Sequence, residues 1–431
     1  MAEAASGRML GALRHRNYRL FFTGQLVSTV GTWMQSVAMP WLALELTHSG
    51  VLVGLVLAAQ FTPILIAGQL GGIVADRFHK RNVLLATQSA FTIPPLVLFL
   101  LTATGHAQYW MVIVAALAAG IINVFDVPAR QAFVVEMVGK QDLTNAIALN
   151  SSVFNASAVI GPSLAGVVIA FLGVPLCFLS NSVSYLAAIA ALLLMRDLPR
   201  HEPPARDQRF FAHLAEGASY ARRDPVVGGL LISVAFFSLF AMNRSTLLPL
   251  FADSVLRVGA QGFGFLLAAM GLGAVGGALT LAFFPEVGAN PRRQLWLAAI
   301  WVVALLEFSI SRVFVISLAT LFVAGYCQIS FLATTNSRLQ TLSPDHLRGR
   351  VMALYMQAFA GMSPIGNVQA GLLATLFGAP WSMAIGASIA GLSLVAIYLI
   401  TPEVFASPQP KKTSSSAATA SAGTSQRSAR T

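Results

Sequence analysis

Charged side chains are scarce in this sequence. Asp, Glu, Lys and Arg together make up only 10% of its 431 residues, whereas a soluble globular protein is about 25% charged. Hydrophobic residues account for 56% of the chain, which is far too many for an intrinsically disordered protein. The composition therefore excludes both a soluble protein with an ordinary polar surface and a disordered one. It indicates that most of the chain is embedded in a membrane.

Cysteine is also rare, and the common catalytic motifs are missing. The two cysteines, Cys177 and Cys327, lie in separate apolar runs, so neither a disulfide framework nor a metal site is expected. The sequence has no Walker phosphate loop, no cluster of metal ligands and no nucleophile motif. We therefore expect a protein that is not an enzyme and has no bound cofactor. ATP-driven transport would require a nucleotide-binding domain, and the central polar stretch is too short to supply one.

Long apolar runs dominate the remaining sequence. A helix needs about 20 apolar residues to cross the hydrocarbon core of a bilayer, and spanning segments without a barrel pattern satisfy their backbone groups as helices. The sequence therefore predicts an all-α membrane protein with twelve transmembrane helices. The approximate limits of the predicted spans are 19–44, 51–74, 83–103, 107–125, 146–172, 175–195, 226–250, 261–284, 294–311, 313–335, 351–377 and 380–400.

The basic residues determine the expected orientation of these spans, because Lys and Arg are enriched on the cytoplasmic side. With the N-terminus in the cytoplasm, all but three of the 27 Lys and Arg residues fall on that side. The exceptions are Arg244, Arg257 and Arg312. This alternation explains the net charge of +11 without a nucleic-acid partner. We expect a multi-pass protein of a bacterial inner membrane, in contact with the lipid bilayer, with both termini in the cytoplasm.

A proline-containing polar stretch divides the predicted spans into two sets of six. The two sets resemble each other weakly, since Pro162 in span 5 and Pro364 in span 11 occupy similar places. Parallel repeats of this kind occur in one class of secondary transporter. The predicted regions are a six-helix bundle at 1–195, a cytoplasmic linker with a short amphipathic helix at 196–225, a second six-helix bundle at 226–401 and a disordered tail at 402–431.

The connection between spans 2 and 3 carries the most specific motif, Gly-Gly-Ile-Val-Ala-Asp-Arg-Phe-His-Lys-Arg at residues 71–81. One interpretation is an ordinary basic loop that follows the orientation rule. The motif also resembles the cytoplasmic loop signature of the major facilitator superfamily, although His79 replaces the usual Gly. The resemblance implies two six-helix pseudo-repeats and a latch between them on the cytoplasmic side. The implied gating residues are Gly72, Asp76, Arg77, Lys80 and Arg81.

Two further segments extend this resemblance. Span 5 contains Gly161, Pro162 and Gly166; Pro permits a kink and Gly a close helix contact, so structural packing is one interpretation. The segment also resembles the Gly-Pro motif of exporters that act by proton antiport. Together with the segment from Asp126 to Arg130 in span 4, it resembles the branch of the superfamily that contains enterobactin-type siderophore exporters and macrolide exporters.

Proton coupling requires a titratable side chain whose access changes during transport. Asp126, near the cytoplasmic end of predicted span 4, is the favoured candidate. Arg130 lies four residues later on the same helical face, so a purely structural ion pair is the alternative. Glu45, near the outer end of span 1, is a second candidate for coupling. Glu307 in span 9 is expected to have a structural role or to pair with Arg312.

Span 1 carries a stripe of polar side chains on one helical face, from Gln25 to Ser36. Such a face points into a bundle or a water-filled cavity, and hydrogen bonding between packed helices is the alternative. In the resembled superfamily, spans 1, 4, 7 and 10 line the central cavity. Arg244 in span 7 either reaches the outer interface or binds an anionic group of a substrate or a carboxylate of the protein. The expected cavity residues are Gln25, Thr29, Thr32, Ser36, Asn123, Asn243, Arg244 and Gln328.

Taken together, the sequence predicts a secondary active transporter that works as a monomer. It is expected to export a small amphipathic organic molecule, drug-like or siderophore-like, by proton antiport and alternating access. An importer or a lysophospholipid flippase of the same fold is one alternative. A membrane scaffold or sensor that transports nothing is another, and it would have no water-filled cavity beside span 1.

Overall fold

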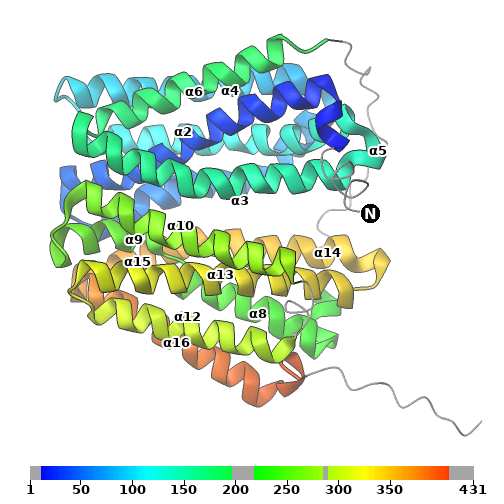
Figure 1. Ribbon diagram of the computed structural model, residues 1–431, viewed down its shortest axis with the longest axis vertical. Coiled ribbons are helices and arrows are strands. Elements are labelled where there is room, and N and C mark those ends of the chain that lie inside the picture. Colours follow the sequence, from blue (N-terminus) through cyan, green and yellow to red (C-terminus); the bar gives the residue numbers. More distant parts are fainter. Residues whose placement is uncertain (1–10, 197–217, 285–289, 407–431) are drawn as a thin grey trace, which may run out of the picture.

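The structure is a computed structural model that describes residues 11–196, 218–284 and 290–406. All regular secondary structure in these ranges is helical (Figure 1). The first half contains η1 (Gly11–Arg14), α2 (Arg16–Thr47), α3 (Gly50–Arg77), α4 (Lys80–Ala103), α5 (Tyr109–Leu172) and α6 (Pro175–Leu193). The second half contains α8 (Pro225–Phe240), α9 (Arg244–Leu250), η2 (Phe251–Val255), α10 (Gly259–Phe283), α12 (Pro291–Ile310), α13 (Phe314–Leu342), α14 (Asp345–Met356), η3 (Gln357–Gly361), α15 (Ser363–Phe377), α16 (Ala379–Ile400) and η4 (Pro402–Val404).

Within these ranges, ten helices are long and apolar enough to cross a membrane. They include both arms of the long helix α5 and the span formed by α8, α9 and η2, which is interrupted at residues 241–243. Two further rods pack among them: α2, which carries the polar stripe, and the interrupted rod α14–η3–α15. This set agrees with the twelve predicted spans. Most of the predicted amphipathic helix in the linker lies outside the described residues, and only its last turns, 218–223, are seen as helix.

The helices form two bundles that lie one above the other in Figure 1, α2 to α6 in one and α8 to α16 in the other. Within the first bundle α2 packs against α5 and α6, and within the second α12 packs against α13 and α16. Basic residues lie at helix ends on one side of both bundles: Arg16 at the start of α2, Arg81 in the first turn of α4, Arg196 just after α6 and Arg292 in the first turn of α12. We call this side the basic end. The opposite side is called the far end.

The two bundles are held together toward the far end. Helix α3 packs along α15, and α5 packs along α10. The largest cluster of buried apolar side chains runs across this junction, from Trp41 in α2 to Phe263 in α10. At the basic end, α14 packs instead on α13 and α8 of its own bundle, and the apolar side chains around Tyr18 and Phe133 form a separate cluster within the first bundle. The described arrangement is therefore closed at the far end.

Glycine permits the closest of these contacts. A Cβ atom placed on Gly264 of α10 would lie 2.6 Å from the Cα of Gly166 in α5, and one placed on Gly371 of α15 would lie 2.3 Å from the carbonyl oxygen of Gly50 in α3. Real Cβ atoms do not approach other atoms so closely. Small residues let membrane helices pack backbone against backbone, so these positions set the separation of the two bundles at the far end.

The predicted boundary between spans 4 and 5 is wrong. Span 4 was expected to end at residue 125, but the helix continues to Gly139, where a left-handed φ of 67° interrupts α5 before its second arm. The polar residues beyond 125 form ion pairs with their neighbours, Arg130 with Asp126 and Glu136 with Lys80. Because these charges are paired within the bundle, they do not terminate the helix.

An internal repeat is visible in the backbone at the far end. Gly173 ends α5 with a φ of 87°, and Gly378 ends α15 with a φ of 88°. A Pro follows two residues later in both places, as the first residue of α6 at Pro175 and as the second residue of α16 at Pro380. A left-handed φ favours glycine, and proline is well suited to the first turn of a helix. The same turn thus joins corresponding spans in the two bundles, as expected of two pseudo-repeats.

The outward surface of the bundles suits a lipid environment. Large apolar side chains such as Ile66 and Ile400 are about 80% exposed. Trp110 and Trp381 are exposed near the far end, and Trp296 is exposed near the basic end. Tryptophan is enriched at both interfaces of a membrane, so these side chains mark the two levels at which the bilayer surface is expected.

Candidate functional site

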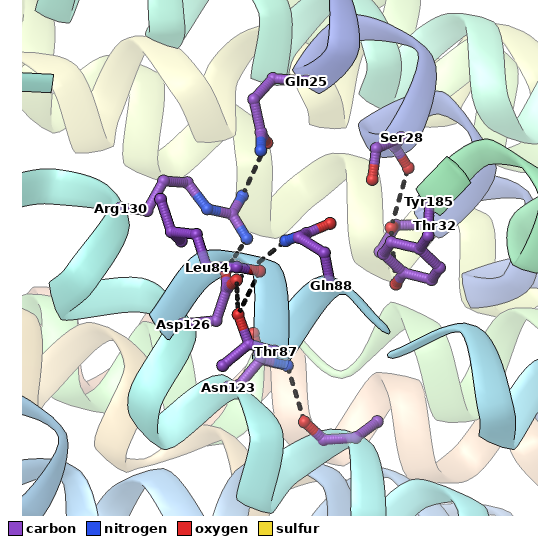
Figure 2. A network of polar contacts seen from close by, with 11 residues as sticks. Gln25, Ser28, Thr32, Leu84, Thr87, Gln88, Asn123, Asp126, Arg130 and Tyr185 are labelled. Carbon is purple, nitrogen blue, oxygen red and sulfur yellow. Dashed lines mark hydrogen bonds and ion pairs between the residues drawn. The ribbon is translucent and has the colours of Figure 1, made fainter. Parts of the chain in front are cut away.

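Asp126 is the centre of a buried polar network between α4 and α5 (Figure 2). Its side chain is fully buried. Thr87 Oγ1 and Gln88 Nε2, both from α4, donate to its Oδ1 at 2.8 Å each, and Arg130 Nη2 donates to its Oδ2. Burying a carboxylate is costly unless hydrogen bonds and a counter-ion compensate it. Here three neighbours supply that compensation, which permits an ionised acid inside the bundle.

Arg130 connects this acid to the polar stripe of α2. Its Nη1 donates to Gln25 Oε1 at 3.0 Å, while its Nη2 pairs with Asp126. The two partners differ in exposure, because the Arg130 side chain is 34% exposed and the Asp126 side chain is 0% exposed. Arg130 is therefore the partly exposed member of the pair, and Asp126 is enclosed by Arg130, Thr87 and Gln88.

The expected position of Asp126 near the end of a span needs correction. Helix α5 continues 13 residues beyond it to Gly139, and its partner Thr87 lies seven residues inside the start of α4 at Lys80. The acid thus lies within the bundle, about two helical turns from the basic end of α4. Hydropathy predicts a loop after Asp126 because the charged residues that follow it in α5 are typical of a loop.

The polar stripe of α2 divides into a buried and an exposed part. Gln25 is buried against Arg130, and Thr29 is half-buried. Thr32 and Ser36, one and two turns further on, are exposed. Thr32 Oγ1 lies 3.2 Å from the hydroxyl of Tyr185 in α6, as Figure 2 shows. Part of the stripe therefore acts as a hydrogen-bonding contact between helices, and the part toward the far end remains open.

Glu45, the second predicted coupling residue, lies far from this network. It is exposed at the far end of α2 and accepts a 2.5 Å hydrogen bond from Trp41 Nε1. The Trp41 ring stacks on Phe263 of α10 with their centroids 6.1 Å apart. Glu45 thus supports an aromatic contact between the two bundles at the closed end.

The Gly161, Pro162 and Gly166 segment places α5 between the two bundles. A Cβ atom on Gly161 would lie 3.0 Å from the carbonyl oxygen of Val30 in α2. Gly166 faces Gly264 of α10 in the other bundle. The expectation of close packing at these glycines therefore fits their surroundings, and a role in coupling remains a prediction.

The residues of the predicted gating loop separate into three groups. Lys80 is buried and its Nζ lies 2.6 Å from Glu136 Oε1 of α5, while Arg81 Nε and Nη2 donate to the last carbonyl groups of α6, those of Leu192 and Leu193. Arg77 is exposed, and it makes no hydrogen bond or ion pair within the described ranges. Gly72 has open space around its Cα. The side chain of Asp76 lies outside the described residues.

This separation predicts different effects for two cations of one loop. Lys80→Met should lower the free energy of unfolding by about 1–3 kcal/mol, because Glu136 loses a buried partner. Arg77→Met should change it by less than about 0.5 kcal/mol, as expected of an exposed side chain, while reducing transport if the loop acts as a latch in another arrangement. Denaturant unfolding of the purified protein measures the first effect, and equal destabilisation by both variants would contradict this assignment.

The other expected cavity residues are dispersed. Asn123 Nδ2 donates to the Ala119 carbonyl one turn away in α5, and Asn243 Nδ2 donates to the Leu239 carbonyl in α8. Gln328 in α13 is buried, and it forms no hydrogen bond within the described part of the chain. Arg244 lies where α8 gives way to α9 and is half-buried. The structure therefore groups only Gln25 with the Asp126 network, through Arg130.

Several polar partners were not anticipated from the sequence. Thr87 and Gln88 of α4 contact Asp126. They precede it by 39 and 38 positions in the sequence, too far for a short motif to reveal the contact. In the second bundle Arg338 Nη1 donates to the buried Gln294 at 2.6 Å. The expected pair of Glu307 with Arg312 is not formed. Glu307 accepts a hydrogen bond from Thr320, and Arg312 donates to the backbone carbonyl groups of Ser309 and Ser311.

Comparison with known proteins identifies relatives along nearly the whole chain. The staphyloferrin A transporter of Staphylococcus aureus is 26% identical over 395 residues, which cover 89% of this chain and 94% of that protein. The enterobactin exporter EntS of Shigella boydii is 26% identical over 384 residues, which cover 89% of this chain and 90% of that exporter.

Solved structures share the fold at lower identity. A bacterial homologue of the lysosomal transporter Spinster, inward-facing and occupied, aligns with a TM-score of 0.71 at 14% identity, covering 92% of this chain and 99% of that one. An inward-facing bacterial homologue of ferroportin aligns with a TM-score of 0.68 at 16% identity, covering 89% of this chain and 98% of that one.

One protein family matches almost the whole length of this sequence. The family described as transmembrane secretion effectors, within the major facilitator superfamily, matches residues 8–421. Its extent includes both bundles and the network around Asp126. The chain therefore belongs to the transmembrane secretion effector family of the major facilitator superfamily, and it is a multi-pass membrane transporter rather than an enzyme.

Proposed function

We propose that this transporter exports a small amphipathic organic molecule of siderophore-like character in exchange for protons. The observation that carries the proposal is the buried Asp126, held by Thr87, Gln88 and Arg130. The names of the two relatives, a staphyloferrin A transporter and an enterobactin exporter, support the substrate class. The orientation of the basic residues supports placement in a bacterial inner membrane with both termini in the cytoplasm.

In this proposal Asp126 holds the proton and Arg130 controls access to it. With the guanidinium in place, the carboxylate is compensated and stays ionised. When Arg130 is drawn away, a buried carboxylate loses its counter-ion, and taking up a proton neutralises it at the lowest cost. Return of the guanidinium favours loss of that proton. One side chain movement can thus couple proton binding to the arrangement of the bundles.

The unsatisfied atoms of the network support such a movement. Arg130 Nε and Gln88 Oε1 are buried, and neither has a hydrogen-bond partner among the described residues. Buried polar atoms without partners carry a free-energy cost, so the observed arrangement of this network is not its only favourable one. A second arrangement or a bound water would satisfy both atoms.

The contacts between the bundles support alternating access. Closure at the far end by α3 with α15 and α5 with α10 leaves access from the basic end. Rocking of one bundle against the other would open the far end and bring the basic ends together. The loop residues Gly72, Asp76 and Arg77 would then act as the latch of that second arrangement, in keeping with their place at the basic end.

Transport in proteoliposomes tests this function directly. Staphyloferrin A and enterobactin are offered as substrates, and a dye inside the vesicles reports the internal pH. We expect either substrate to accelerate the collapse of an imposed pH gradient, and a gradient to drive substrate accumulation against its concentration. Transport of these compounds that is indifferent to the size and direction of the gradient would rule out antiport.

A further inference from the structure

Span 7 is interrupted at a charged residue. Helix α8 ends at Phe240, and α9 begins at Arg244 after three residues outside helix. Non-helical backbone at membrane depth is tolerated only where it is buried in protein or lines a cavity. Two other polar side chains near this break have partners: Asn243 donates to the Leu239 carbonyl, and Thr246 donates to Asn367 at 2.9 Å. Half-buried Arg244 makes no hydrogen bond or ion pair with any residue that the structure describes.

A guanidinium in this position requires a counter-ion. A charged side chain near the centre of a membrane helix costs about 2.5–3.5 kcal/mol on insertion scales. The next exposed polar residue toward the far end, Asp253, lies nine residues away, or about 13 Å along a helix. This is farther than a single side chain extends, so Arg244 does not reach the polar end of its span.

Within the described ranges, Arg244 forms no ion pair. Arg130 of the first bundle has Asp126 four residues before it, whereas the residues four before and four after Arg244 are Phe240 and Leu248. Asp253 of the same span lies nine residues away, and Glu307 is engaged with Thr320. No acid among the described residues therefore pairs with Arg244.

Arg244 lies where the second bundle meets the first, and its side chain is half-buried. Helix α9 packs against α2 and α3 of the first bundle as well as against α15. Leu250, six residues after Arg244, packs against Gly50 at the closed far end. Arg244 thus lies on the basic side of the closure, in the part of the second bundle that meets the first. A solute that enters from the basic end encounters it before reaching the closed contacts.

We propose that Arg244 binds a carboxylate of the transported molecule, so that the substrate is an organic anion. This inference rests on the proposed transport function and adds the chemical class of the substrate and the residue that recognises it. A guanidinium forms two parallel hydrogen bonds with a carboxylate, and a low-dielectric site strengthens them. Proton exchange at Asp126 and anion binding at Arg244 would then take place in different bundles.

Equilibrium binding of matched compounds tests the inference. The purified full-length protein is titrated in a neutral detergent at pH 7 with three pairs: benzoate and benzamide, 2-naphthoate and 2-naphthamide, and decanoate and decanamide. We expect the wild-type protein to bind at least one carboxylate roughly tenfold tighter than its amide, the range of one charge-assisted hydrogen bond. Arg244→Gln should abolish this preference, and Arg244→Lys should retain part of it.

Controls separate recognition from folding and from lipid binding. Arg257→Gln removes an exposed cation near the far end and should leave the preference intact. A preference absent in the wild-type protein, or unchanged in Arg244→Gln, overturns the proposal. A third outcome also overturns it: phosphatidylglycerol stabilises the wild-type protein more than phosphatidylcholine does, this effect is absent in Arg244→Gln, and no carboxylate preference is seen. Arg244 would then hold a lipid phosphate.

The test is independent of proton coupling. Binding is measured without a gradient, so it reports on Arg244 whichever residue carries the proton. Failure of antiport in proteoliposomes therefore leaves the binding result standing. If Arg244→Gln does not fold, Arg244→Lys provides the test, because the lysine retains the charge. An Arg244→Lys protein that melts at the wild-type temperature but has lost the carboxylate preference overturns the proposal.

Discussion

Asp126→Asn is expected to abolish accumulation driven by a pH gradient while leaving passive substrate exchange measurable. Asn has nearly the same shape as Asp and can still accept hydrogen bonds from Thr87 and Gln88, but it cannot bind and release a proton. We expect at least a tenfold loss of gradient-driven accumulation. Counterflow in proteoliposomes, which needs substrate exchange but no net proton movement, should fall much less.

The same variant should also be less stable, because it leaves Arg130 without its anion. Removing one partner of a fully buried pair costs about 3–5 kcal/mol, and we expect about 1–3 kcal/mol here because the Arg130 side chain is one-third exposed. The double variant Asp126→Asn, Arg130→Gln should recover most of this stability without recovering accumulation. Recovery of both would show that Asp126 has only a structural role.

Glu45→Gln is the matched control for this experiment. It also removes a carboxylate from a bundle helix, but Glu45 is exposed and bonded to Trp41 at the far end. We expect gradient-driven accumulation to persist in this variant. Loss of accumulation in Glu45→Gln with normal accumulation in Asp126→Asn would move the coupling site to the far end of α2.

Gly264→Leu is expected to open the far end of the transporter. A side chain at this position would collide with the backbone of Gly166 and with the carbonyl oxygen of Pro162, and both belong to the helix of the opposite bundle that must approach for closure. Overpacking of this kind costs about 1–3 kcal/mol. That corresponds to roughly a 5- to 150-fold shift between two arrangements, so transport should fall and the arrangement open at the far end should dominate.

A single reporter cysteine measures this shift. The buried Cys177 and Cys327 are first replaced, and Ser36→Cys is introduced on the exposed part of the α2 stripe. A membrane-impermeant thiol reagent added from the far side should label this position faster in Gly264→Leu than in the parent protein. Gly68→Leu is the control, because a Cβ atom at Gly68 has nothing within 4 Å. Equal labelling in both glycine variants would show that the Gly264 contact does not hold the far end closed.

The class of transporter could be predicted from local features of the sequence. Long apolar runs and the alternation of basic connections predict the spans and their orientation, because both signals act within single segments. The loop motif and the Gly-Pro segment predict the superfamily, which the match over residues 8–421 establishes. The pairing of Asp126 with Arg130 was also readable, because residues four apart share one face of any helix.

Other features depend on segments that are distant in the sequence. Thr87 and Gln88 join Asp126 only because α4 packs along α5. The predicted boundary at residue 125 is wrong because a hydropathy scale treats each charged residue separately. Ion pairs keep these charged residues inside the bundle. The expected pair of Glu307 with Arg312 is wrong, because Glu307 bonds instead to Thr320 on the next helix.

The sequence by itself determined that this is a helical membrane protein and to which family it belongs, because the free energy of transfer into lipid is a sum over residues within each segment and the family motifs are local. Tertiary structure alone decided which end of the bundles is closed, which acid is compensated by a cation and which cation is left without an anion. These properties depend on distances between helices, and only packing sets those distances. Asp126 and Arg244 illustrate the difference: both are charges in predicted spans, but only the fold gives Asp126 its partners and leaves Arg244 available to a ligand.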